Sequence, residues 1–123
     1  TEGRGMTSQT VNLAEKLSLF SERWSPKIVA DFNGHDVMVV KVLGEFNWHS
    51  HPHTDDFFLV LKGRLRIRLR DGDVTLGPGE LYVVPKGVEH CPVAEEETHI
   101  LLIEPAGVPN TGDPATAAAK NRI

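Results

Sequence analysis

The sequence contains a single cysteine among its 123 residues, and aromatic side chains make up only 7% of it. A single cysteine excludes a disulfide framework within the chain and fits a reducing compartment, so we expect a cytoplasmic protein. No stretch approaches the roughly 18 consecutive apolar residues that a membrane-spanning helix requires, and the N-terminus lacks the apolar segment of a signal peptide. The formal net charge of −4 disfavours general binding to polyanions. We therefore expect neither a membrane partner nor a nucleic-acid partner.

The remaining composition is that of one globular domain with many turns. Hydrophobic residues make up 40% and charged residues 24%, both ordinary for a single domain of this length. Eleven glycines and eight prolines, combined with few aromatics, favour a turn-rich β protein. We interpret residues 1–6 as a vector-derived leader that ends at the native start, Met6.

Residues 7–36 are expected to hold one short helix and a lead-in strand. The best helix candidate is Asn12–Phe20, because Asn12 followed by Glu15 has the form of a capping box and the apolar residues fall on one helical face. This helix should end before Pro26, since the residue that precedes a proline avoids the helical region.

From Lys27 onward the hydrophobic period changes from helical spacing to two. Turn-forming residues separate eight short apolar runs, which are Lys27–Ala30, Val37–Leu43, Phe46–His51, Phe57–Leu61, Leu65–Leu69, Val74–Leu76, Leu81–Val84 and Ile100–Ile103. Eight strands with one helix predict an all-β fold, either a closed barrel or two antiparallel sheets. The pattern fades after Glu104, so residues 105–123 are interpreted as a tail without its own core, and Ala115–Ile123 is expected to add little stability.

Five basic residues alternate with apolar ones along one predicted strand and its ends, so that all five lie on one face. They are Lys62, Arg64, Arg66, Arg68 and Arg70. We interpret this face as a solvated outer surface, balanced by Glu95–Glu97 from another segment, because antiparallel sheets commonly have one wet face. The alternative is a cationic stripe that binds an anionic ligand or nucleic acid, which the negative net charge disfavours.

Histidines and acidic residues gather in one stretch of the sequence. On a strand, His49 and His51 point to the same face with Cβ atoms about 7 Å apart, so both imidazoles can reach one ion. Imidazole suits the divalent transition metals Fe, Mn, Co, Ni, Cu and Zn. Either Asp55 or Asp56 can add a carboxylate, and His90 follows a proline-glycine turn in a second segment. The pattern predicts a transition-metal site.

These two stretches resemble the two motifs of the cupin superfamily. In the first motif, the His49-x-His51 pair is followed after four residues by Asp56 and after six more by Gly63. The second motif is matched at every spacing by Gly79, Pro85, Gly87 and His90. The resemblance covers about Val37–Glu104. It implies a single-domain jelly-roll barrel, or double-stranded β-helix, with a divalent metal held by His49, His51, Asp56 and His90.

The sequence departs from the cupin motifs at three places. Asp56 stands where the family usually has a glutamate, which shortens the carboxylate by one methylene and puts direct coordination in doubt. Ala94 replaces the usual final asparagine of the second motif, and the gap between Gly44 and His49 is one residue short. None of these changes affects the three histidines.

Alternation along the predicted strands gives the lining of a pocket. Asn47 shares a face with His49, while Phe58 and Val60 share a face with Asp56, so the walls should be apolar with one amide. Such a pocket suits a small, mostly apolar or aromatic molecule.

Several other side chains have two interpretations each. His53 and Tyr82 are candidate acid–base groups, although a surface role for His53 and a core role for Tyr82 are favoured. Cys91 should face away from His90 as a small buried hydrophobe, with a redox role as the alternative. His35 and His99 are interpreted as ordinary surface or core residues.

The resemblance implies a metal-dependent enzyme of the oxygenase or isomerase type that acts on a small organic molecule inside the barrel. One alternative is a non-catalytic module that binds a metal or small ligand, for example as a sensor. Another is a metal-independent sugar isomerase or epimerase that uses a histidine base.

Phe57, Leu59 and Leu61 are apolar on the face opposite Phe58, so we also expect a homodimer that covers this strand and Lys27–Ala30.

Overall fold

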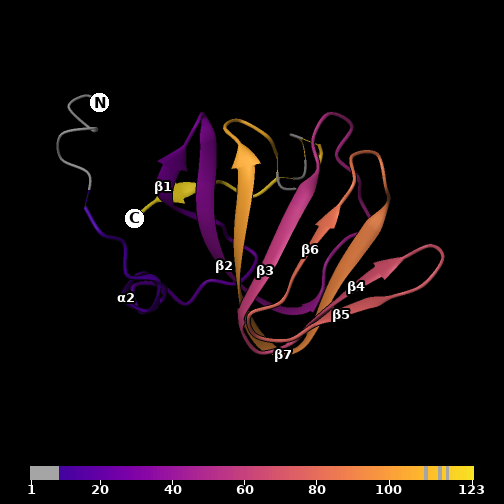
Figure 1. Cartoon of the computed structure of the whole chain (residues 1–123), viewed down its shortest axis with the longest axis horizontal. Coiled ribbons are helices and arrows are strands. Elements are labelled where there is room, and N and C mark those ends of the chain that lie inside the picture. Colours follow the sequence, from indigo (N-terminus) through magenta and orange to yellow (C-terminus); the bar gives the residue numbers. More distant parts are fainter. Residues whose placement is uncertain (1–8, 110, 114, 116) are drawn as a thin grey trace.

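Strands make up most of the structure, a computed structural model that describes residues 9–109, 111–113, 115 and 117–123. The interpretation of residues 1–6 as a leader lies outside the described residues. Within them, one helix and eight strands follow one another along the chain (Figure 1). They are α2 (Leu13–Leu17), β1 (Lys27–Phe32), β2 (His35–Glu45), β3 (Asp56–Lys62), β4 (Leu65–Leu69), β5 (Val74–Leu76), β6 (Leu81–Val84), β7 (His90–Pro105) and β8 (Asn121–Arg122).

The strands form the all-β jelly roll expected from the sequence, arranged around β7. The strand order is β5-β4-β7-β2-β1-β8, and β3 pairs with both β7 and β6. Val42 of β2 pairs with Thr98, whereas Gly44 pairs with Ala94, so residues 95–97 of β7 bulge. This bulge bends β7. Its first part pairs with β4 and its later part pairs with β3, so one strand belongs to both sides of the barrel.

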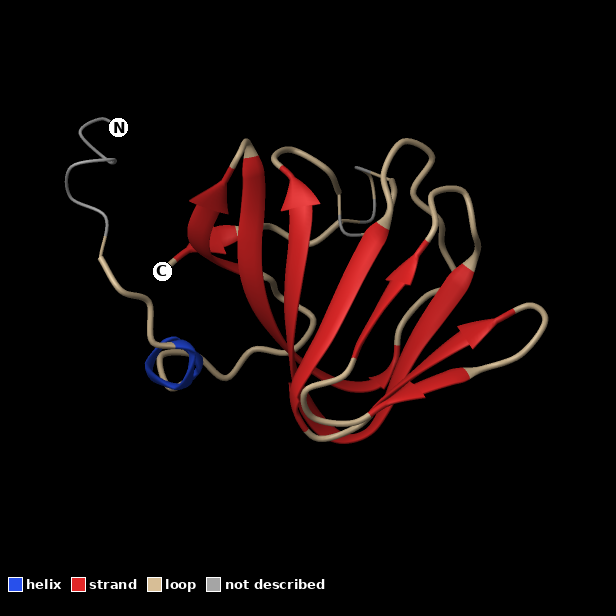
Figure 2. Ribbon diagram, viewed as in Figure 1, coloured by secondary structure: helices blue, strands red, loops and turns tan. Residues whose placement is uncertain are grey.

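The core fills the interior of the barrel through simple alternation. Met38, Val40 and Val42 of β2 point inward with Phe58 and Val60 of β3, and all five are buried. A second, smaller cluster lies on the outer side, where Leu17 of the helix packs with Val29 and Val39. The helix therefore lies beside the sheet rather than within it (Figure 2). No helix in the described part of the chain is long and apolar enough to cross a membrane.

The helix is shorter than the sequence predicted. Asn12 is its N-cap, and its side-chain Oδ1 accepts a hydrogen bond from the backbone N–H of Glu15 at 3.0 Å. The helix ends at Leu17 instead of Phe20. This capping bond is the one expected from the Asn12–Glu15 spacing.

The prediction of a strand over Phe46–His51 is wrong. β2 continues to Glu45, and the residues that follow leave the sheet and form only an isolated bridge between His49 and His90. Gly44 has a φ of +87°, a left-handed conformation that glycine adopts without strain. The chain therefore turns out of the sheet just before the histidines.

The C-terminal residues dock against the barrel. β8 pairs in parallel with β1, and Ile123 packs into the outer cluster beside the helix. Arg122 forms an ion pair with Asp31 at 3.0 Å. The tail thus adds a strand beside β1 and an apolar side chain to the outer cluster.

The basic face of β4 is solvent-exposed, and its arginines form ion pairs. Arg66 pairs with Asp73, Arg68 with Glu45 and Arg70 with Glu89, at distances of 3.0 to 3.3 Å. These acidic partners differ from the expected Glu95–Glu97. Within that acidic run, Glu97 pairs instead with Arg23.

Candidate metal centre

Four side chains from three parts of the fold converge at one end of the barrel. His49 and His51 lie on the irregular segment after β2, Asp56 begins β3, and His90 begins β7. One ligand atom from each residue lies within 4.8 Å of those of the other three. The structure therefore brings together all four side chains that the sequence assigned to the metal.

Backbone hydrogen bonds hold the two histidine segments in place. His49 and His90 exchange a pair of bonds, N–H to O in each direction, at 3.0 and 2.9 Å. The N–H of Gly87 donates to the carbonyl of His51 at 2.8 Å. Asp55 accepts from the N–H of Lys86 at 2.9 Å and is exposed. Asp55 thus joins the two loops, and Asp56 is the carboxylate of the cluster.

The ring orientations of His49 and His90 are set by their own backbone. Nδ1 of His49 lies 2.8 Å from the carbonyl of Asn47, and Nδ1 of His90 lies 2.9 Å from the carbonyl of Val88. A carbonyl only accepts, so each Nδ1 carries the proton, which is how metal-binding imidazoles are usually oriented. Each Nε2 is left as the atom that can bind an ion.

Two imidazoles of the cluster share one carboxylate oxygen. Nε2 of His90 lies 2.8 Å and Nε2 of His51 lies 3.2 Å from the same carboxylate oxygen of Asp56. Such separations suit neighbouring ligand atoms that each lie about 2 Å from one ion. His51 is 2% exposed, and neither of its ring nitrogens has a well-oriented hydrogen-bond partner. A buried nitrogen without a partner is costly, and the residues present therefore fit a divalent metal.

Burial and the shared carboxylate control the charges in the cluster. Burial lowers the pKa of His49 to about 4. Burial also opposes the charge on Asp56 and on His51, but the contacts between them outweigh it. The pKa of Asp56 is therefore lowered by its contacts with the imidazoles of His51 and His90, and the pKa of His51 is raised by its contact with Asp56. At neutral pH the cluster offers a neutral His49 beside a carboxylate anion, the forms that bind metals.

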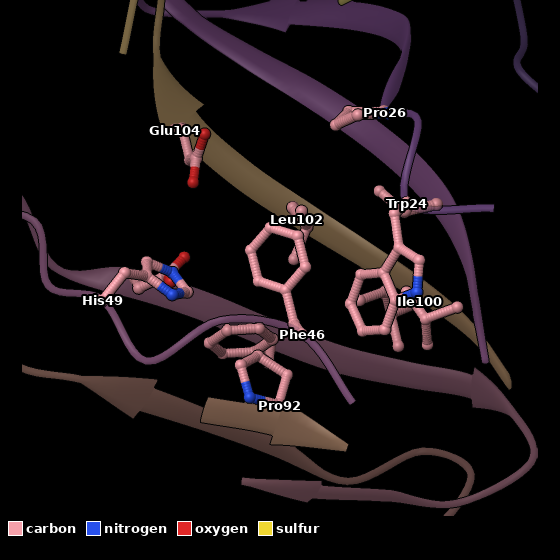
Figure 3. Close-up of a pocket in the computed structure, with 12 residues that line it drawn as sticks. Trp24, Pro26, Phe46, His49, Pro92, Ile100, Leu102 and Glu104 are labelled. Carbon is pink, nitrogen blue, oxygen red and sulfur yellow. The ribbon is translucent and has the colours of Figure 1, made fainter. Parts of the chain in front are cut away.

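A cavity with mostly apolar walls lies against the cluster. Trp24 and Phe46 stack with ring centroids 4.7 Å apart, and Phe46 meets the ring of His49 edge-on at 5.3 Å. Figure 3 shows these aromatic side chains between the two walls of the barrel. The free volume is about 40 Å³, room for a few water molecules. A ring-sized ligand therefore requires Phe46 or Trp24 to move. The full lining is Trp24, Pro26, Val40, Val42, Phe46, His49, Asp56, Phe58, Pro92, Ile100, Leu102 and Glu104.

The expected pocket residues have different places. Phe58 lines the cavity, but Val60 lies in the barrel core and Asn47 is exposed, and neither is part of the lining. Asn47 contributes its backbone carbonyl to His49 instead. The alternation argument failed for Asn47 because it assumed a strand over Phe46–His51.

The other candidate residues do not belong to the four-residue cluster. His53 is exposed, and Tyr82 is half-buried against the barrel core. Cys91 is buried with its Sγ near the side chain of Glu45, and burial raises the pKa of the thiol to about 11. His35 bonds to a backbone carbonyl, and His99 pairs with Glu97.

Of the twelve lining residues, the sequence had pointed only to His49, Asp56 and Phe58; those it missed include Trp24, Pro26 and Glu104. Trp24 and Pro26 precede the first strand, and nothing in their local pattern places them over the site. Glu104 did carry a signal, because it continues the inward positions of Ile100 and Leu102 with a charged residue.

The chain belongs to the cupin family. The cupin domain model matches residues 36–104. The Bacillus subtilis (strain 168) protein YdbB, itself uncharacterized, is 31% identical over 98 residues, which cover 79% of this chain and 87% of YdbB. A cupin-2 domain containing protein from Shewanella frigidimarina NCIMB 400 has a crystal structure with a TM-score of 0.79 and 50% identity, covering 82% of this chain and 99% of that one.

Some relatives are named as dioxygenases. A 3-hydroxyanthranilate 3,4-dioxygenase from Brucella anthropi is 33% identical over 85 residues, which cover 61% of this chain and 46% of the relative. The chain thus matches less than half the length of that enzyme. The hydroquinone 1,2-dioxygenase PnpCD shares the fold, with a TM-score of 0.66 at 17% identity over 86% of this chain and 74% of that one. The protein is therefore a small cupin with a cluster of three histidines and one aspartate that could hold a metal.

Proposed function

We propose that His49, His51, Asp56 and His90 bind one divalent transition metal, drawn from Fe, Mn, Ni, Co, Cu and Zn, and that the protein is a metal-dependent enzyme. The observation that carries this proposal is the convergence of three imidazoles on one carboxylate, with His51 buried and lacking a well-oriented partner. When bound, such a metal supplies a Lewis acid with coordination positions open to an oxygen-containing ligand.

The residues of the chain prepare the site for this chemistry. The carbonyls of Asn47 and Val88 fix two imidazole rings before any ion arrives, which limits the reorganisation on binding. The short carboxylate of Asp56 begins a strand and is 4% exposed, so its position is set by β3. The face of the cluster that meets the cavity lies beside mostly apolar walls, with room for only a few water molecules.

We propose a small aromatic molecule as the substrate, and oxygenation rather than isomerisation as the reaction. Trp24, Phe46 and Phe58 give the cavity walls to which an aromatic ring is complementary. The Brucella anthropi relative supports the same class of substrate, because the name of that enzyme specifies a hydroxylated aromatic acid as its substrate.

The test of this proposal is metal analysis followed by oxygen uptake. Protein purified without added metal is examined for its elements, then loaded with Fe(II) and offered small phenols while oxygen is recorded. Oxygen uptake that depends on both the metal and the phenol is the expected result. Bound metal without turnover would favour the binding or sensor module, and full activity after chelation would favour a metal-independent isomerase or epimerase.

We also propose that the protein is a cytoplasmic homodimer whose interface differs from the one expected from the sequence. Leu61 packs against the outer cluster, and β1 is covered by the helix and β8, so these parts of the expected interface are occupied by the chain itself. The outer face of β3 and β6, in contrast, is partly exposed. Phe57 pairs with Val83 and Leu59 with Leu81 across the two strands, and Leu81 is 54% exposed. This apolar face is the one that a second copy would cover.

A further inference from the structure

One buried carboxylate of the cavity has no part in the metal cluster. Glu104 is 2% exposed and lines the same cavity as His49 and Asp56. Figure 3 shows its carboxylate turned into the cavity from the end of β7. Ile100 and Leu102 occupy the preceding inward positions of the same strand and are apolar. A charge at this position is not needed to fill the barrel.

A lysine from the C-terminal segment holds this carboxylate. Nζ of Lys120 lies 3.0 Å from Oε1 of Glu104 and also donates to the carbonyl of Val108. Lys120 lies outside residues 36–104, the part of the chain that matches the cupin domain. A buried ion pair is often no more stable than two well-packed apolar side chains. Stability alone therefore does not explain why the structure contains this buried ion pair.

The contacts of Glu104 indicate what it can bind. Lys120 bonds to Oε1, which leaves Oε2 for a molecule in the cavity. Burial and the negative charge of Asp56 raise the pKa of Glu104, while Lys120 opposes this effect. With the Lys120 ammonium beside Oε1, an amino or hydroxyl group would donate a hydrogen bond to Oε2 of the carboxylate, whereas another anionic acceptor would be repelled.

We propose that Glu104, positioned by Lys120, binds an amino or hydroxyl substituent of an aromatic ligand in the cavity. Another polar group of the same ligand would face the histidine cluster. This inference rests on the proposed function and narrows its substrate class to rings that carry a hydrogen-bond donor in addition to the group that faces the metal. It also makes the C-terminal segment part of the site.

The test compares the binding of phenol, 3-aminophenol and 4-aminophenol to the full chain loaded with Zn(II), a metal without redox chemistry. Calorimetry under anaerobic conditions gives the three dissociation constants for the wild type, Glu104→Gln and Lys120→Met. We expect one aminophenol to bind about tenfold more tightly than phenol in the wild type, the effect of one hydrogen bond to a charged group. Glu104→Gln should reduce this ratio to about twofold, and Lys120→Met should reduce it in part, with zinc content unchanged in both. Glu97→Gln, the same substitution at an exposed glutamate, should keep the wild-type ratio.

The outcomes separate this inference from the proposed function. If phenol and both aminophenols bind the wild type equally, or if Glu104→Gln keeps the preference, Glu104 has no such role while the metal site stands. A wild type that binds no zinc overturns the metal site itself, and zinc-loaded protein that binds none of the three rings overturns the aromatic class together with the role of Glu104. Should the single variants fail to fold, Glu104→Leu combined with Lys120→Met replaces the pair by apolar side chains, and it must lose the preference for the aminophenol.

Discussion

The three histidines of the cluster are chemically identical, but the fold gives them different surroundings. His49 and His90 each have one ring nitrogen bound to a backbone carbonyl, whereas His51 is buried without a well-oriented partner for either nitrogen. Two of the rings are therefore fixed by local backbone geometry. The third depends on Asp56 and on whatever ion the cluster holds.

Replacing any one of these histidines by alanine should weaken metal binding by about 100-fold or more, since the loss of a ligand must exceed the 10–100-fold cost of losing an outer-shell partner. The barrel should remain folded, because its core consists of apolar side chains such as Met38 and Val60. Competition with a chromophoric chelator measures the zinc affinity, and circular dichroism checks the fold. His53→Ala is the matched control, since His53 is exposed near the site. Equal affinity of His51→Ala and His53→Ala would contradict the assignment.

The pH dependence of the metal-free protein tests the surroundings of His49. Its pKa is lowered from 6.5 to about 4, so the unfolded chain takes up this proton at a higher pH than the folded chain does. Stability should therefore fall as the pH drops below about 6.5 towards 4. The raised pKa of His51 acts in the opposite sense, because its contribution is present at low pH and is lost as the pH rises through the folded pKa.

Urea unfolding of the chelator-treated protein between pH 7 and pH 4.5 separates the two effects. The wild type should lose stability more steeply with falling pH than His49→Gln, which has no titratable ring at this position. Parallel curves for the two proteins would mean that His49 is not shielded from water.

At the residue scale, sequence spacing was sufficient to predict which four side chains cluster, but it was not sufficient for the lining of the cavity. His49, His51, Asp56 and His90 were predicted because their chemistry and separations match a known pair of motifs. Trp24 reaches the cavity only through tertiary packing, and no short-range pattern records that approach.

At the scale of elements, the turn between β3 and β4 explains why a glycine stands in the first motif. Gly63 has a φ of +93°, and a Cβ atom there would lie 2.5 Å from Oγ1 of Thr98 and 3.0 Å from the carbonyl of Glu97. The turn thus packs directly against the bulge that bends β7. Backbone conformation and crowding both require glycine at this position.

Gly63→Ala and Gly34→Ala separate these two requirements. Gly34 has a φ of +76° with no atom within 4 Å of its would-be Cβ, so alanine there should cost only the left-handed conformation, about 1 kcal/mol. Gly63→Ala should cost about 1–3 kcal/mol more, because the neighbouring backbone has to shift. Urea denaturation measures the free energy of unfolding of both variants. Equal losses would mean that the backbone of β7 can shift at the bulge at little cost.

Alternation of side chains along a strand predicts which residues point inward only where the strand is regular. It gave the inward residues of β3 and β4, because burial alternates along those strands. It failed after Gly44, where the chain leaves the sheet. The segment that carries His49 and His51 is the one that local periodicity described least well.

At the scale of the whole molecule, the C-terminal segment joins three parts of the fold. Lys120 reaches Glu104, Arg122 pairs with Asp31, and Ile123 packs beside the helix. The sequence indicated a weakly attached tail because a single short strand and one apolar residue leave little local pattern.

Deleting residues 119–123 should destabilise the protein by about 3 kcal/mol or more, because it leaves the buried carboxylate of Glu104 without its partner. Arg122→Ala removes only an ion pair whose arginine side chain is 57% exposed, and it should cost less than about 1 kcal/mol. Thermal and urea unfolding measure both changes. A deletion that costs no more than Arg122→Ala would mean that the segment lies loosely on the barrel.

The apolar outer face of β3 and β6 predicts the assembly of the protein. Leu81 and Val83 are 54% and 40% exposed, and their cross-strand partners on β3 are Leu59 and Phe57. Among the described strands β6 pairs only with β3, so one edge and one face are open to a second copy. A two-fold arrangement buries the same patch from both subunits.

Light scattering at micromolar concentration should therefore give twice the chain mass of 13.6 kDa. Leu81→Glu places a charge at the centre of this face and should shift the protein to monomer, since an unpaired charge is costly to bury. Leu19→Glu is the control, because Leu19 is similarly exposed, at 62%, but follows the helix instead of lying on β6. A wild type that remains monomeric at high concentration would contradict the dimer, while a dimer that survives Leu81→Glu would place its interface on another face.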